Sequence, residues 1–315
     1  AGRCGTMSGG YIPRKGLDAL NNYKYKSGEY SWLDNRLNNF WFWCAEQLPR
    51  WMAPNVVTMI GTTHLFVIAV LAQLFDPTLE GKSPSWVFLV NAWCLFVYQT
   101  MDAADGKQAR RTGSSSPLGQ LFDHGCDSLG TTFIAIGLCS LLGLGGHWQT
   151  VSVLATVQIP FYLCQWEENH VHVLRAQVGN FGVTEGQYLS IVLNIATAVF
   201  GSHIWKRTIA GTLAALGMGA VPVPSLVGDL VVGDVSIVIG AVFPAILALS
   251  TVLSVARLTT NFARALLLTA PLWLQQGLQI CIQRHQPARD LYLANPVPFI
   301  VVQGVLLSHL ANRII

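Results

Sequence analysis

Long apolar segments separated by short polar stretches make up most of this 315-residue sequence. Because a hydrocarbon core of about 30 Å needs about 20 helical residues at about 1.5 Å each, such segments are candidate membrane helices. They lie at about residues 56–74, 86–100, 118–142, a segment ending near 166, 188–205, 235–255, 262–282 and 296–311. Prolines in or near the last two segments indicate kinks or helix ends. The pattern therefore predicts an all-α, polytopic integral membrane bundle.

Two stretches fit this pattern less well. Residues 209–234 are rich in glycine, alanine and proline, and are compatible either with a further span or with a loop that skims the membrane. Residues 32–43 mix aromatic side chains with amides at near-helical spacing. That mixture predicts an amphipathic N-terminal helix, which either lies in the headgroup region or packs as a soluble helix on the rest of the protein.

Composition supports a membrane protein and argues against several other classes. Hydrophobic residues make up 52% of the chain and charged residues only 11%, about half the charged share of soluble domains. The net charge of +3 includes no basic run, so we expect no nucleic-acid partner. The seven cysteines are scattered singly, which favours reduced packing residues over disulfides or a metal-thiolate site.

Basic residues are distributed unevenly between the connections. They are densest before the first span and again between the second and third spans, at positions 107, 110 and 111. The connection between the first and second spans has only Lys82. By the positive-inside tendency, the N-terminus and the connection after the second span lie on the cytosolic side.

Four aspartates stand where the second apolar segment ends and the third begins. Asp102 and Asp105 are spaced i,i+3, and Asp123 and Asp127 are spaced i,i+4, so each pair shares one helix face. The connection between the pairs ends in Ser-Ser-Ser-Pro, with a serine as the expected N-cap and Pro117 at the first helical position. It is short enough to return the second helix antiparallel to the first, which brings the carboxylates together. Because clustered carboxylates repel one another and are costly to desolvate, divalent cations are the simplest way to neutralise them.

Eight fixed positions around these aspartates form the pattern D-x2-D-G-x2-A-R-x8-G-x3-D-x3-D, from Asp102 to Asp127. This pattern resembles the complete signature of the CDP-alcohol phosphotransferases. Flanking sequences, such as Pro-Asn-Val-Val-Thr at 54–58 and Leu-Phe-Asp-His-Gly-Cys-Asp at 121–127, resemble the eukaryotic choline/ethanolamine phosphotransferases. The resemblance extends over roughly the first two thirds of the chain.

The resemblance implies an enzyme that transfers phosphocholine or phosphoethanolamine from CDP-choline or CDP-ethanolamine to diacylglycerol. It would release CMP and form phosphatidylcholine or phosphatidylethanolamine. We expect a cytosolic N-terminal segment at residues 1–52, a catalytic core of membrane helices at 53–256 and additional C-terminal membrane helices at 257–315. Eukaryotic members of the family usually have about ten spans, so we expect about 8 to 10 here. The resemblance also implies an endoplasmic reticulum or Golgi membrane, with the active site facing the cytosol, and it allows a homodimer.

By the resemblance, the metal ligands are Asp102, Asp105, Asp123 and Asp127. Two magnesium ions held by these oxygen ligands, with manganese as a substitute, would clamp the donor oxygens on both sides of the displacement. The alternative is a structural cluster held by salt bridges, which is less compatible with acidic residues inside membrane segments.

Four further residues are candidates for donor binding. Gly106 would let the backbone approach the nucleotide, although a glycine that terminates a helix gives the same pattern. Arg110 is the best placed donor of a bidentate hydrogen bond to phosphate. Gly119 lies one turn before Asp123, where a side chain would intrude on the metal face, but a helix-packing glycine is the alternative. Asn55 resembles the family's donor-binding asparagine and is also compatible with an ordinary N-cap.

The acceptor hydroxyl needs a base, and two residues qualify. His124 carries an imidazole, which titrates near neutral pH, and it lies between two predicted ligands. Asp127 is the other candidate, and the resemblance leaves both open. Because metal binding lowers the proton affinity of an aspartate, we favour His124 as the base and Asp127 as a ligand.

Choline carries a quaternary ammonium, which forms no hydrogen bonds and is bound by aromatic faces. Trp166 and Glu167, at the end of the fourth segment, are candidates for this role, together with Glu168. Tyr98 or Trp93 on the second segment would complete the cage. Aromatic residues at membrane boundaries more often form an interfacial belt, which is the competing interpretation.

Two other functions are compatible with the sequence. One keeps the chemistry but changes the head group or acceptor, for example to inositol or glycerol phosphate. The other is an ion-binding transporter or scaffold, in which the acids would hold an ion in transit. The flanking sequences favour choline or ethanolamine over the first. Release of CMP that depends on both magnesium and diacylglycerol would exclude the second.

Overall fold

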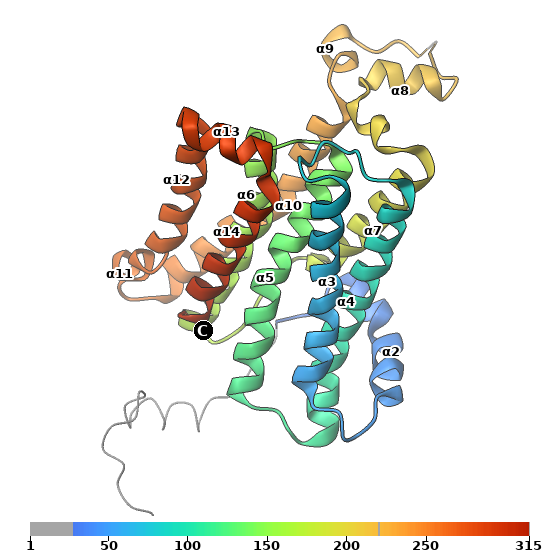
Figure 1. Cartoon of the computed structure of the whole chain (residues 1–315). Helices are drawn as coiled ribbons and strands as arrows, with labels where there is room; N and C mark the ends of the chain where they lie inside the picture. The colour runs from blue at the N-terminus through green and yellow to red at the C-terminus, as the bar shows by residue number, and fades with distance from the viewer. Residues whose placement is uncertain (1–27, 220, 315) are drawn as a thin grey trace, which may run out of the picture.

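Four consecutive helices joined by short connections form the centre of the protein, seen in a computed structural model that describes residues 28–219 and 221–314. They are α3 (Pro54–Phe75), α4 (Ser85–Thr112), α5 (Pro117–Leu142) and α6 (Trp148–Val171). The chain reverses direction at each connection, so α3, α4 and α5 lie side by side in alternating directions (Figure 1). The all-α class predicted from the sequence is confirmed.

The turn between α4 and α5 follows the predicted signals. Helix α4 ends at Gly113, which adopts the left-handed conformation with φ of 67°. The side chain of Ser116 caps α5 by accepting a hydrogen bond from the backbone N–H of Gly119 at 3.1 Å, and Pro117 is the first helical residue. Because this turn is so short, the two halves of the aspartate motif return to the same level of the bundle.

Later helices pack around this centre. Helix α7 (Val183–Phe200) packs against α4, and α10 (Val232–Leu258) packs against α6. A small antiparallel pair, β1 (Gln177–Val178) with β2 (Phe181–Gly182), connects α6 to α7 and was not expected from the sequence. The short 3-10 helix η1 (Ser202–Lys206) follows α7.

The stretch at 209–234 does not form a further span. Before α10 begins at Val232, its described residues form two short helices, α8 (Ile209–Ala215) and α9 (Ser225–Gly228), which project beyond one end of the bundle (Figure 1). An isolated β-bridge between Thr208 and Val231 closes this excursion at its base. The described part of this stretch therefore argues against a further span, and the membrane-skimming loop stays a prediction.

The C-terminal part contains α11 (Phe262–Leu267), α12 (Ala270–Arg284), α13 (Gln286–Ala294) and α14 (Pro296–Asn312). The kink or helix end expected near Pro271 is confirmed, because the segment at 262–282 divides into α11 and α12 just before this proline. A proline is tolerated in the first turn of a helix but not in its interior, so it favours a new start there. Helix α14 packs against α5.

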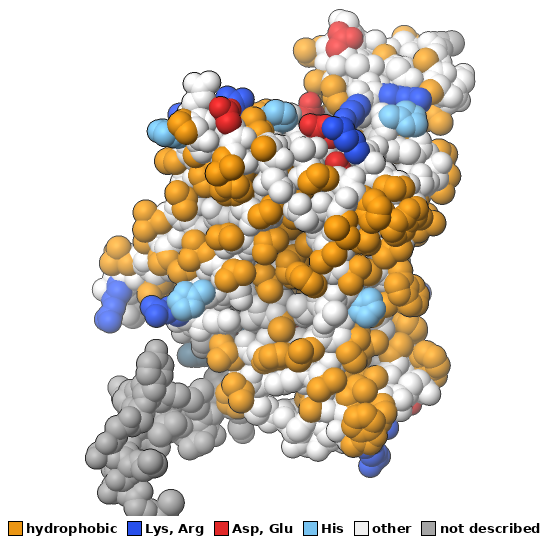
Figure 2. Space-filling view, in the orientation of Figure 1, with side chains coloured by type: hydrophobic (Ala, Val, Ile, Leu, Met, Phe, Trp, Pro, Cys, Tyr) orange, Lys and Arg blue, Asp and Glu red, His pale blue; other side chains and the backbone are white. Residues whose placement is uncertain are grey.

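Four helices of the described residues are long and apolar enough to cross a membrane, namely α3, α4, α5 and α10. A fifth is obtained if α13 and α14, which meet at a bend of 104°, are counted as one span. The protein is therefore an integral membrane protein, and the finer expectation of 8 to 10 spans stays a prediction. Figure 2 shows hydrophobic side chains over the middle of one face, with charged side chains mainly toward its two ends.

Helix α2 (Trp32–Gln47) combines the two alternatives considered for it. Its start has a capping box between Ser31 and Asp34, and Glu185 of α7 accepts a hydrogen bond from the backbone N–H of Leu33 at 2.9 Å. Trp41 is buried against the bundle, whereas Trp43 is 57% exposed. The helix therefore packs on the protein with one side and presents aromatic side chains outward with the other. Residues 1–27, which include most of the basic residues counted before the first span, lie outside the described residues.

Small residues bring α3 and α5 close together. A Cβ atom added to Gly130 would lie 2.8 Å from Leu65, and one added to Gly137 would lie 2.8 Å from Ile68. Both neighbours are fully buried in the largest apolar cluster of the protein. This close contact holds the part of α5 that follows its two aspartates against the middle of α3.

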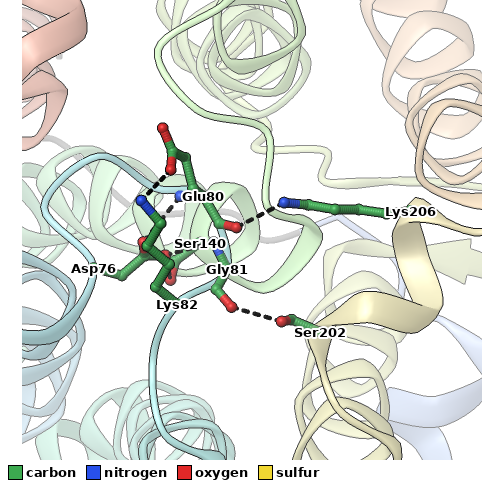
Figure 3. A network of polar contacts seen from close by, with 7 residues as sticks. All are labelled: Asp76, Glu80, Gly81, Lys82, Ser140, Ser202 and Lys206. Atoms are coloured by element: carbon green, nitrogen blue, oxygen red, sulfur yellow. Dashed lines mark hydrogen bonds and ion pairs between the residues drawn. The ribbon is translucent and has the colours of Figure 1, made fainter.

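A polar network fixes the opposite end of the bundle (Figure 3). The buried carboxylate of Asp76 accepts hydrogen bonds from Ser140 at 2.6 Å and from the backbone N–H groups of Glu80 and Gly81 at 2.9 Å each. Lys206 of η1 donates to the backbone carbonyl of Glu80 at 2.9 Å. These contacts tie the α3–α4 loop to the ends of α5 and η1, far from the aspartate motif.

Candidate functional site

The aspartates of α4 and α5 converge as the sequence predicts. Side-chain oxygens of Asp102, Asp123 and Asp127 all lie within 4.8 Å of one another. One comes from α4 and two from α5, so the group depends on the antiparallel return of the chain at Ser116 and Pro117. Three carboxylates at this spacing form an oxygen-only cluster of the kind that holds a hard divalent cation.

Asp105 lies beside this group of three and is held by a third helix. Its carboxylate accepts a hydrogen bond from the hydroxyl of Thr58 on α3 at 2.5 Å, and the aspartate is buried. On its other side it neighbours Asp123. The sequence did not predict a role for Thr58, the last residue of the flanking segment at 54–58. Nothing near this threonine in the sequence marks it as the partner of an aspartate 47 positions away.

Tyr98 orients one of the aspartates. Its hydroxyl donates to Oδ1 of Asp127 at 2.8 Å from a buried position on α4, one turn before Asp102. The sequence suggested Tyr98 or Trp93 for a choline cage, and the structure gives each a different setting. The tyrosine hydroxyl is engaged with the carboxylate, and Trp93 is 60% exposed on the outside of α4.

The surroundings of the cluster fit a divalent cation better than a structural salt bridge. Among the described residues, none of the four aspartates forms an ion pair with a lysine or arginine. The nearby Lys107 lies over the rings of Trp41 and Phe42, at 5.4 and 4.9 Å from their centroids. Oδ1 of Asp123 is buried, and within the described residues it has no hydrogen-bond partner. An oxygen that is buried, anionic and unpaired is costly unless a cation binds it.

His124 turns toward α6. The imidazole is buried, its Nδ1 lies 3.9 Å from Oε2 of Glu168, and Gln165 forms a hydrogen bond with the ring. Gln120, one turn earlier on α5, donates to Oε1 of Glu168 at 2.7 Å. The structure therefore pairs the histidine with a buried carboxylate. The sequence named Glu168 only for the cage, although Gln120 and His124 share a helix face and mark the side on which such a partner would lie.

The candidates for donor binding lie where α3, α4 and α5 meet near the α4–α5 turn. A Cβ atom added to Gly119 would lie 3.7 Å from Oδ1 of Asn55, so these two residues are neighbours. Asn55 lies inside the first turn of α3 and Ala53 is the N-cap, so the N-cap alternative for the asparagine was wrong. Gly106 lies in the interior of α4, so it does not terminate the helix either.

Two of the three basic residues near the motif have structural partners. Arg111 donates to the backbone carbonyls of Ala45 at 2.9 Å and Leu48 at 2.7 Å, which caps the end of α2. Lys107 stacks on the aromatic side chains of the same helix. Arg110 is exposed, and among the described residues it has no ion pair. It is therefore the arginine left available to an anionic ligand.

Trp166 and Glu167 contact the later helices of the bundle. Trp166 is fully buried, and its indole N–H donates to the backbone carbonyl of Ala265 in α11 at 2.8 Å. Glu167 is also buried and forms an ion pair with Arg175. Their assignment to a choline cage stays a prediction, and each has a structural role on the α10 and α11 side.

Comparison with known proteins gives a consistent family match. A family model described as CDP-alcohol phosphatidyltransferase matches residues 51–223. "Uncharacterized CDP-alcohol phosphatidyltransferase class-I family protein 2" of Dictyostelium discoideum is 34% identical over 307 residues, which are 97% of this chain and 69% of that protein. "Choline/ethanolaminephosphotransferase 1" of Arabidopsis thaliana is 40% identical over 65% of this chain. "Cholinephosphotransferase 1" of Saccharomyces cerevisiae is 40% identical over 64% of it. The chain spans about half the length of these last two relatives, 52% in each case.

Proposed function

The chain belongs to the CDP-alcohol phosphatidyltransferase family, and on that premise we propose that it transfers phosphocholine or phosphoethanolamine from the CDP-activated alcohol to diacylglycerol. The products would be CMP and phosphatidylcholine or phosphatidylethanolamine. The observation that carries this proposal is the convergence of Asp102, Asp123 and Asp127 at one level of a membrane bundle. The choice of head group rests on the relatives that are 40% identical and are named for choline or ethanolamine.

The four aspartates would hold two magnesium ions, with manganese as a substitute. When bound, the ions would neutralise the pyrophosphate oxygens of the donor and the charge that develops during transfer. The chain prepares for this by fixing the ligands in advance. Thr58 holds Asp105 and Tyr98 holds Asp127, so neither carboxylate needs to be ordered when the cation binds.

The donor would bind beside the α4–α5 turn. Arg110 presents a guanidinium, which suits the bidentate recognition of a phosphate oxygen pair. Gly106 leaves space on the same side, since a Cβ atom there would approach only Nη1 of Arg110, at 3.6 Å. Asn55 and Gly119 lie together across the turn, and the amide would donate to the nucleotide.

His124 would act as the general base. It would accept the proton of the diacylglycerol hydroxyl while the hydroxyl oxygen forms a bond to the β-phosphorus of the donor, and the bond from that phosphorus to the CMP oxygen breaks. The transfer is direct, because a hydroxyl acceptor needs no phosphoenzyme. Glu168 would position the imidazole and stabilise its protonated form, as the carboxylate partner of a catalytic histidine does. Asp127 is the alternative base, but its hydrogen bond from Tyr98 supports the role of an oriented ligand.

Several finer features belong to the same proposal. The catalytic core would occupy residues 53–256, with the active site facing the cytosol of the endoplasmic reticulum or Golgi, and with about 8 to 10 helices crossing the membrane. A homodimer is compatible with the fold. The choline cage of Trp166 and Glu167 is tested by the Michaelis constant for CDP-choline in Trp166→Ala and Glu167→Gln variants. A constant equal to that of the wild type in both would exclude the cage.

The decisive experiment measures CMP release by the purified full chain. We expect release only when magnesium, diacylglycerol and CDP-choline or CDP-ethanolamine are all present. Asp123→Asn should abolish it, and Asp290→Asn, which changes an exposed aspartate on α13, should leave it intact. Activity only with inositol or glycerol phosphate would replace the head-group assignment. Binding of magnesium without CMP release from any donor would favour the transporter or scaffold.

A further inference from the structure

An open groove runs along the outer side of α10 near its C-terminal end. It has a volume of about 440 Å³. Its lining consists of Arg175, Ile246, Leu249, Ser250, Leu253, Ser254, Arg257 and Leu258. All of these except Arg175 belong to α10, which is one of the helices long and apolar enough to cross a membrane. Nothing in the proposed reaction uses this groove.

One wall of the groove is apolar and faces outward. Ile246, Leu249 and Leu253 are 48%, 60% and 45% exposed, and their spacing places them on one stripe of the helix. Only 17% of the most apolar window of α10 is buried among the described residues, and we infer that the rest of it faces lipid chains. A stripe from residue 246 to residue 258 is about 18 Å long at about 1.5 Å per residue, which matches much of an acyl chain.

The other wall is polar and carries positive charge. Arg175 comes from the segment after α6, and Arg257 lies in the last turn of α10. Glu167 and Ser254 both hold the Arg175 guanidinium, and Glu167 balances its charge. Arg257 has no ion pair among the described residues, so one positive charge of the groove is uncompensated. Ser250 and Ser254 add hydroxyl groups on the same side.

We propose that this groove binds an anionic phospholipid. The phosphate and acidic head group would lie between Arg257 and the fixed guanidinium of Arg175, and one acyl chain would lie along the apolar stripe that starts at Ile246. Basic pockets at the ends of membrane helices bind acidic head groups through this combination of charge and apolar wall. A zwitterionic lipid has no net negative charge, so it would be attracted less strongly to the uncompensated Arg257. A soluble phosphate would leave the apolar wall uncovered, so the groove as a whole fits a lipid.

The groove and the aspartate site lie on different sides of the end of α6. Glu168 faces α5, where it meets His124 and Gln120, and the adjacent Glu167 meets Arg175 at the groove. Successive residues of a helix point about 100° apart, which separates the two carboxylates. The lipid would therefore contact the segment that supports the catalytic helix without entering the site. The proposal does not depend on which reaction the aspartates serve.

Native mass spectrometry of the full chain in detergent tests the proposal directly. We expect dioleoylphosphatidylserine to remain bound at several-fold higher occupancy than dioleoylphosphatidylcholine at equal concentration. Arg257→Gln should weaken phosphatidylserine binding about fivefold, the effect of one basic residue near an anionic headgroup. Arg257→Lys should retain most of the binding, because it keeps the charge. Leu249→Gln, which makes the apolar wall polar, should also weaken it.

Arg264→Gln is the matched control, since Arg264 is an exposed arginine on α11 outside the groove lining. It should bind phosphatidylserine like the wild type. Equal retention of the two lipids, or equal loss in the Arg257 and Arg264 variants, would overturn the proposal. Competition by glycerophosphoserine as effective as that by the intact lipid would also overturn it, because the apolar wall would then contribute nothing.

Discussion

Replacing Tyr98 with phenylalanine isolates one hydrogen bond at the aspartate cluster. The tyrosine is buried, and its hydroxyl donates to Oδ1 of Asp127 at 2.8 Å. Phenylalanine keeps the ring and its packing in the apolar cluster formed by α3, α4 and α5. The variant should therefore fold, and the change is confined to the orientation and charge balance of one carboxylate.

The size of the effect follows from the strength of that bond. A hydrogen bond to a charged group contributes about 1.5–3 kcal/mol, and about 1.4 kcal/mol is a tenfold change in an equilibrium constant. Substituting a residue that orients a metal ligand typically lowers metal affinity or activity about 10- to 100-fold. We therefore expect the magnesium concentration that gives half-maximal CMP release to rise about tenfold or more in Tyr98→Phe. The rate at saturating magnesium should fall less, because the ligands themselves remain.

Tyr162→Phe is the matched control for this experiment. Tyr162 is also buried, and its hydroxyl donates to the backbone carbonyl of Leu268 at 3.0 Å, at the contact of α6 with the C-terminal helices. Both variants lose one hydroxyl and one hydrogen bond, so both should lose similar stability. Only the Tyr98 variant should change the magnesium dependence. An unchanged magnesium midpoint in Tyr98→Phe, or an equal shift in both variants, would refute the argument that the hydroxyl orients a ligand.

Three further substitutions test other contacts. Thr58→Val removes the hydrogen bond to Asp105 while keeping the side-chain shape, and should lower the rate of CMP release about tenfold at fixed magnesium. Gly137→Ala crowds α3 and should lower the free energy of unfolding by about 1–3 kcal/mol. Gly240→Ala on α10 is the control and should not lower it, because a Cβ atom there would have no described neighbour within 4 Å. Glu168→Gln should lower kcat about tenfold and leave the KM for the CDP-donor nearly unchanged, since the carboxylate would position the proposed base, His124.

The features that could be predicted from the sequence are those carried by local spacing. The i,i+3 and i,i+4 aspartate pairs and the serine–proline start of α5 lie within about 25 residues, and together they fix where the carboxylates meet. Thr58, Tyr98 and Glu168 act through contacts between helices. Their roles depend on the rotation of each helix about its axis, which a motif within one segment does not record.

In two further places, the sequence left alternatives that the backbone geometry decides. Hydropathy at 262–282 is continuous, but the helix breaks just before Pro271, as the proline itself indicated. Asn55 stands at the start of a helix, where an N-cap is expected, yet the helix already begins at Pro54 with Ala53 as its cap. In both places, one or two residues of backbone geometry decided between alternatives that composition left equal.

The end of α6 shows why neighbouring acidic residues need separate explanations. Glu167 and Glu168 are both buried, and a buried carboxylate is costly without its own partner. Glu167 meets Arg175, and Glu168 meets His124 and Gln120. The first pairing links α6 to α10 through Ser254, and the second links α6 to the aspartate-bearing helix. One helix end thus connects α5 to α10, because two adjacent side chains find partners on different sides of α6.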